Sequence, residues 1–134
     1  MNLLVDIDVP DLAQGVDFYC EAFGLRLARV LDQDVAELVG GSSVIYLLQK
    51  DADSTCASST AEQRHYSRHW TPVHLDFVVE NIQTATQQVI EAGAVRESDC
   101  VEWRGSKCIT FSDPFGNGFC LIEFEGDTYR SDAA

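Results

Sequence analysis

Apolar residues recur along this chain in two kinds of pattern, and the same succession of patterns occurs twice. Residues 3–9 alternate as in a short strand, and an apolar stripe of helical spacing follows, with Asp11 as its N-cap and Gly24 just past its end. Residues 73–79 form a second strand pattern, and a second helical stripe follows, capped by Asn81. A repeat of this kind indicates two structural modules built on one plan.

Each helical stripe is followed by further segments rich in branched and aromatic residues, a composition typical of strands. In the first half these segments are 26–31, 35–39 and 43–49, and in the second half they are 94–97, 106–112 and 117–124. Each half therefore predicts a βαβββ module, and the whole chain predicts an α+β fold.

A stretch rich in small polar residues separates the two halves. The predicted organisation is a first module at 1–52, a linker or lid at 53–71, a second module at 72–126 and a tail at 127–134. Within the linker, two arginines and two histidines recur at a spacing of four, which predicts one exposed helical turn. These residues are Arg64, His65, Arg68 and His69.

Successive residues of a strand point to opposite faces of the sheet, so odd-numbered and even-numbered residues of one strand lie on different faces. In the first strand Leu4, Asp6 and Asp8 share one face, and the apolar residues between them take the other. In the strand that opens the second half, His74 and Asp76 share the corresponding face. Because the two halves repeat, we expect these polar residues to gather on the sheet faces that point away from the helices.

The charge balance narrows the choice of partners. The chain has 22 acidic and 9 basic residues, which gives a formal net charge of −13. Such an excess repels polyanions, so nucleic acid and anionic membrane surfaces are poor partners. A cationic ligand is favoured instead, provided that some of the acids line a cleft.

The cysteines and the hydropathy pattern indicate a cytoplasmic protein. Five cysteines occur at irregular spacing without a CxxC motif, and no run of 18 apolar residues is present. The N-terminal stretch lacks the basic residues of an export signal. We therefore expect free thiols in a reducing cytoplasm and no membrane-spanning segment.

Three segments carry a resemblance to a known family: DLAQGVDFYCEAFGL, EWRGSKCITF and FSDPFGNGFCLIEF. Together with the duplicated βαβββ pattern, they resemble the vicinal oxygen chelate superfamily. That superfamily includes glyoxalase I, extradiol dioxygenases, and the fosfomycin and bleomycin resistance proteins. The resemblance covers nearly the whole chain. It implies that the strands of the two modules curl into a cup, a curled mixed sheet with the helices packed on its outer face.

In the metal-dependent members of this superfamily, four strand residues hold a divalent ion in the cup. Carried over to this sequence, the four positions fall on Leu4, Tyr46, His74 and Cys120, and only His74 matches the family pattern. Leucine has no donor atom, tyrosine is a poor ligand unless ionised, and a thiol is softer than the carboxylates that bind Mg²⁺ or Mn²⁺. Glu123 has suitable chemistry, but alternation puts it on the strand face opposite to Cys120.

Because three of the four ligand positions differ from the family pattern, the chain is more similar to the metal-free branch of the superfamily, to which the bleomycin resistance proteins belong. That resemblance implies a homodimer that binds a small organic molecule without a cofactor, in an acidic cup suited to a cationic or aromatic ligand. The predicted ligand-binding residues are Asp6, Asp8, Tyr46, His74, Asp76, Trp103 and Cys120.

Two alternatives stay open at this point. One is a glyoxalase-like lyase or isomerase, in which a divalent metal in a rearranged site acts as a Lewis acid. The other is a soft zinc site formed by Cys108 and Cys120 together with His74.

Overall fold

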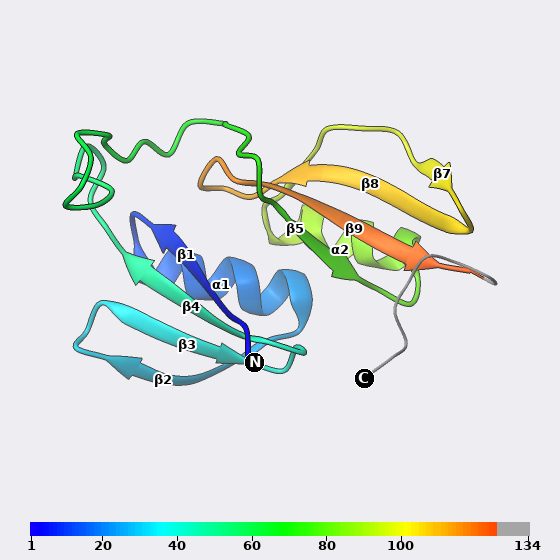
Figure 1. The fold of residues 1–134 in the computed structure, drawn as a ribbon. Helices are drawn as coiled ribbons and strands as arrows, with labels where there is room; N and C mark the ends of the chain where they lie inside the picture. Colours follow the sequence, from blue (N-terminus) through cyan, green and yellow to red (C-terminus); the bar gives the residue numbers. More distant parts are fainter. Residues whose placement is uncertain (126–134) are drawn as a thin grey trace. The chain divides into compact units, whose positions relative to one another are not determined.

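The computed structural model describes residues 1–125. The chain divides into two compact units, the first covering residues 1–67 and the second beginning at Arg68 (Figure 1). Each unit combines one mixed sheet with one helix, which confirms the predicted α+β fold of two βαβββ-like modules. The predicted tail at 127–134 lies outside the described residues, and the curling of the strands into a cup stays a prediction. No helix within residues 1–125 is long and apolar enough to cross a membrane.

The first unit is a four-stranded sheet with a helix packed on one face. Its elements are β1 (Leu4–Val9), α1 (Leu12–Phe23), β2 (Arg26–Leu31), β3 (Val35–Val39) and β4 (Val44–Gln49). The strand order is β1-β4-β3-β2, with β1 parallel to β4 and the other neighbours antiparallel. The core lies between the sheet and α1, where Val9, Phe18, Leu38 and Leu47 are almost completely buried.

Local sequence signals fix both ends of α1. The Asp11 side chain accepts a hydrogen bond from the main-chain N–H of Gln14 at 2.9 Å, which satisfies one of the free donors of the first turn. Gly24 ends the helix with φ at 64°, a conformation that glycine adopts without a steric penalty. The predicted caps of this helix are therefore confirmed.

The second unit repeats this plan with one additional short strand. Its elements are β5 (Leu75–Val78), α2 (Ile82–Ala92), β6 (Val95–Arg96), β7 (Val101–Trp103), β8 (Ser106–Ser112) and β9 (Gly118–Phe124). The order is β5-β9-β8-β6, with β7 also paired to β8. Asn81 caps α2 by accepting a hydrogen bond from the main-chain N–H of Thr84, as predicted.

The strand β7 differs from the sequence prediction, which placed a single strand at 94–97 and none at 101–103. Both β6 and β7 pair with β8, so together they form one interrupted edge strand. At the interruption, Glu97 donates its main-chain N–H to the carbonyl of Thr110, and the Ser98 hydroxyl accepts the Thr110 N–H at 2.9 Å. A side chain thus replaces the missing main-chain partner, and the strand pairing resumes beyond it.

A buried aspartate holds the turn between β8 and β9. Asp113 is 4% exposed, and its Oδ1 accepts the main-chain N–H groups of Phe115 and Asn117 at 2.8 and 2.9 Å. Its Oδ2 accepts the side-chain amide of Asn117 at 2.9 Å. This turn, predicted from DPFGN, places Thr110 opposite Cys120 in the β8–β9 register.

The linker is irregular and lacks the predicted helical turn at 64–69, so that prediction was wrong. Arg64 donates to the carboxylate of Asp8 at 2.7 Å and to the carbonyl of Thr55 at 2.5 Å, within the first unit. Arg68 binds the Glu97 carboxylate through two nitrogens, within the second unit. The two arginines satisfy carboxylates and main-chain carbonyls, which holds the chain extended rather than helical. The role of this segment as a lid stays a prediction.

Candidate functional site

The sheet of the second unit has one face covered by α2 and one that points away from it, here called the open face. Glu123 identifies the covered face, because its carboxylate accepts the main-chain N–H of Ile82, the first residue of α2, at 2.9 Å. Strand alternation then puts Cys120 and Ile122 on the open face. This confirms the predicted opposite orientation of Glu123 and Cys120.

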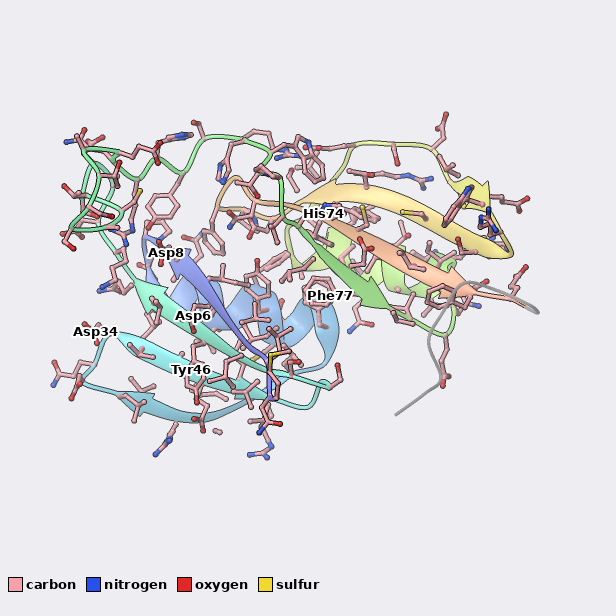
Figure 2. The ribbon with its side chains drawn as sticks, viewed as in Figure 1. Asp6, Asp8, Asp34, Tyr46, His74 and Phe77 are labelled. Carbon is pink, nitrogen blue, oxygen red and sulfur yellow. The ribbon has the colours of Figure 1, made fainter. Side chains whose placement is uncertain are left out.

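Strand pairing brings the polar residues of the open face together. Asp76 lies beside Cys120 in the parallel pair of β5 and β9, and Thr110 lies beside Cys120 in the antiparallel pair of β8 and β9. His74 Nε2 is 3.1 Å from Asp76 Oδ1. A ring nitrogen of His74, a carboxylate oxygen of Asp76 and the Sγ of Cys120 all lie within 4.8 Å of one another. We call these three residues the His–Asp–Cys cluster; Figure 2 labels its histidine.

The members of this cluster differ in their access to solvent. The side chains of His74 and Asp76 are 41% and 43% exposed, whereas Cys120 is only 7% exposed. The hydroxyl of Thr110 is 3.6 Å from the Cys120 sulfur. Burial, followed by the neighbouring Cys120 thiol, raises the pKa of the Cys108 thiol to about 12. Cys108 is therefore a neutral thiol at physiological pH.

Trp70 lies next to the cluster on the same face. A β-carbon added to Gly118 would come within 2.5 Å of the Trp70 ring, so the indole rests directly on the glycine main chain. The Trp70 and His74 rings meet edge to face with their centroids 5.6 Å apart. The Arg68 guanidinium stacks 4.4 Å from the centre of the Trp70 ring, and Trp70 is 50% exposed. An exposed aromatic surface thus borders the polar cluster.

Trp103 lies toward the other end of the same face. It pairs with Ser106, which in turn pairs with Phe124 in β9, so strand alternation gives Trp103 the same side as Cys108 and Cys120. Trp103 is 55% exposed, and the Arg104 guanidinium is 5.2 Å from the centre of its ring. The open face therefore carries an exposed indole at each end and the cluster between them.

In the first unit, Asp6, Asp8 and Tyr46 share the sheet face that points away from α1, and Figure 2 labels all three. Asp6 lies beside Tyr46 in the β1–β4 register. Tyr46 donates its hydroxyl proton to the Glu37 carboxylate at 2.8 Å.

The carboxylates of the first unit are partly neutralised by arginines. Hydrogen bonds from Arg29, and then from Tyr46, lower the pKa of Glu37, and the same Glu37 contact raises the pKa of Tyr46. The carboxylate of Asp8 is paired with Arg64.

The structure thus places the predicted residues in two groups, one on each unit, and adds partners that the sequence analysis missed. Glu37 lies opposite Tyr46 in the β3–β4 register, so the two side chains are on the same face of the sheet. The alternation of side chains within 35–39 would have predicted this position for Glu37. Arg64 belongs to an irregular segment, where no periodicity predicts a contact across 56 residues with Asp8.

The residues at the family's ligand positions do not fit the divalent ion that the superfamily resemblance implies. Leu4 offers no donor atom, and the Tyr46 hydroxyl is a hydrogen-bond donor whose raised pKa keeps it neutral. Cys120 offers a thiol where a carboxylate would be needed, and Glu123 contacts the N-terminus of α2 instead. Of the four positions only His74 keeps a family ligand, so a site of hard oxygen ligands is not present among them.

Comparisons with known proteins agree with this architecture. The model of the glyoxalase-like domain family matches residues 4–122, so the chain belongs to that family. Comparison with the curated proteins found no match.

Solved structures with the same fold include a glyoxalase/bleomycin resistance protein/dioxygenase family enzyme from Burkholderia phytofirmans. Its TM-score is 0.71 at 19% identity, over 90% of this chain and 95% of that one. A glyoxalase/bleomycin resistance protein/dioxygenase from Nocardioides has a TM-score of 0.67 at 20% identity, over 99% and 89% of the two chains. A fosfomycin resistance protein from Listeria monocytogenes has a TM-score of 0.70 at 15% identity, over 96% and 92%. At sequence identities of 15%, 19% and 20%, the similarity to these structures shows a shared fold.

Proposed function

We propose that this glyoxalase-like protein binds a small organic molecule without a metal ion, and that it works as a cytoplasmic homodimer. The observation that supports this best is the loss of the family's ligand set, with Leu4 and Tyr46 in the first unit and Cys120 in place of a carboxylate in the second. The fold is kept while the oxygen ligands are absent from those positions. Binding on the retained scaffold is the function that this combination favours.

The open face of the second unit has the chemistry of a surface for an aromatic ligand that carries a positive charge. Trp70 and Trp103 each present an exposed indole, which attracts flat rings and cations. Asp76 supplies a carboxylate between them, with its Oδ1 3.1 Å from His74 Nε2. The net charge of −13 adds long-range attraction for a cation, which raises the association rate.

In the first unit, Asp6 is the carboxylate best suited to a cationic ligand. It is exposed, and it has no ion pair within the described part of the chain, whereas Asp8 is paired with Arg64. The predicted role of Asp8 in ligand binding therefore requires that Arg64 release it.

The proposal is tested by a thermal-shift screen of aromatic cations and neutral aromatic analogues, in the presence of a chelator. A ligand should raise the melting temperature equally with and without the chelator. Asp6→Lys and Asp76→Lys, made separately, should weaken binding of the cation and leave binding of a neutral analogue less affected. Asp51→Lys, at an exposed aspartate outside both sheets, is the matched control. Binding that disappears on chelation would refute the metal-free proposal.

One observation favours a second candidate function, a glyoxalase-like lyase or isomerase. The His–Asp–Cys cluster supplies one nitrogen, one oxygen and one sulfur within 4.8 Å, a donor set that suits zinc better than magnesium. Metal-dependent isomerisation of a hemithioacetal, lost on chelation and lost in His74→Ala, would establish this alternative. A size measurement by light scattering tests the homodimer separately.

A further inference from the structure

We infer that Cys120, His74 and Asp76 form a nucleophilic thiol with its base and its orienting carboxylate, and that Cys120 bonds covalently to soft electrophiles of the α,β-unsaturated carbonyl class. This activity goes beyond the reversible binding proposed above and does not depend on it, because a protein can bind a molecule without reacting with it. The inference rests on the placement of three side chains within one unit.

The geometry assigns a separate role to each residue. A nucleophilic thiol needs a base nearby and a third group that holds the base in position. Asp76 Oδ1 is 3.1 Å from His74 Nε2, within the distance at which it would accept a hydrogen bond from an Nε2–H and orient the imidazole. A neutral His74 with its proton on Nε2 keeps Nδ1 free to accept a proton. The Cys120 sulfur lies within 4.8 Å of a His74 ring nitrogen and of an Asp76 carboxylate oxygen, within reach of proton transfer through one water.

Strand pairing holds this arrangement in place. Asp76 and Cys120 are direct neighbours in the parallel β5–β9 pair, so their side chains leave the sheet on the same face. The edge of the Trp70 ring contacts His74 and limits its rotation. Cys120 is 7% exposed, so most of its surface is removed from water.

The reaction balances without a further reactant. The Cys120 S–H bond breaks and its proton passes to His74, while a sulfur electron pair forms a C–S bond at the β-carbon of the electrophile. The π electrons of the C=C bond move toward the carbonyl oxygen, which gives an enolate. His74 then returns the proton to the α-carbon. The net change is one C–S bond and one C–H bond formed, with one S–H bond and one C=C π bond lost.

The test uses acrylamide, a small α,β-unsaturated amide, on the full-length protein treated with a chelator. Peptide mapping by mass spectrometry gives a separate alkylation rate for each cysteine. Cys56 is exposed and serves as the internal reference. We expect Cys120 to be alkylated faster than Cys56 despite its burial, because a positioned base is worth about 10²–10⁴-fold in rate. Slower alkylation of Cys120 than of Cys56, the order that burial alone would give, would overturn the inference.

Two variants separate the proposed roles from simple exposure. His74→Gln keeps a hydrogen-bonding group beside Asp76 but removes the base, and it should slow Cys120 alkylation by at least about tenfold while Cys56 is unchanged. Asp76→Asn should slow it less. Circular dichroism must show that each variant is folded, because unfolding would bring the Cys120 rate to that of the exposed Cys56 and so imitate the expected loss. An unchanged rate in His74→Gln would overturn the inference.

Discussion

The turn between β8 and β9 should depend strongly on the Asp113 carboxylate. Asp113→Ala removes the acceptor of the Phe115 and Asn117 main-chain N–H groups and of the Asn117 side-chain amide. Phe115 is 1% exposed, so water does not readily replace the lost acceptor there. A buried donor left without a partner costs about 1–3 kcal/mol. With one buried and one half-buried main-chain donor, we expect a loss of about 2–4 kcal/mol in the free energy of unfolding.

Urea denaturation followed by circular dichroism measures this loss. Asp113→Asn keeps one carbonyl oxygen for the main-chain donors, so it should lose roughly half as much as the alanine variant. Asp51→Ala, at an exposed position, should stay within about 0.5 kcal/mol of the parent protein. Amide exchange should also increase along β9 in Asp113→Ala, because the turn fixes the register of that strand. If Asp113→Ala were as stable as Asp51→Ala, the role assigned to the buried carboxylate would be wrong.

Three further predictions concern single side-chain contacts. Tyr46→Phe removes a hydrogen bond that lowers the pKa of Glu37, so an NMR titration should show that pKa rising, and an unchanged value would contradict the contact. Gly118→Ala should displace the indole of Trp70, shift its fluorescence and cost about 1 kcal/mol, since the added β-carbon would lie 2.5 Å from the ring. Glu97→Gln should cost about 1 kcal/mol at pH 7 by weakening its arginine pair. The pKa of Glu97 is lowered in the folded protein, so its contribution is present at neutral pH and the difference from Gln should vanish as pH falls through that lowered pKa.

Much of the fold could be predicted because most strands are rich in branched and aromatic residues, and in β3 and β4 buried positions also alternate with less buried ones. The strands at 26–31, 35–39 and 106–112 have the bounds that their composition predicted. The exception, β7, has only three residues, which is too short for a strand pattern to stand out in the sequence. β7 forms because its main chain pairs with β8, and this pairing cannot be predicted from the local sequence.

For the candidate site, the alternation of side chains along each strand could predict only the face of the sheet on which a residue lies. Parity correctly separated Glu123 from Cys120 and put His74 on the same face as Asp76. The distance between Asp76 and Cys120 depends on the register of β5 against β9, two strands far apart in the sequence. Likewise, the pairing of Asp8 with Arg64 follows from the path of an irregular segment. Such contacts are set by tertiary structure rather than by the spacing of residues along the chain.

The central claim, binding without a metal ion, is tested most directly by elemental analysis of the purified protein after expression in medium supplemented with zinc, nickel and manganese. We expect a metal content far below one ion per chain, in the parent protein and in His74→Ala alike. A stoichiometric divalent ion in the parent protein that is absent from His74→Ala would contradict it.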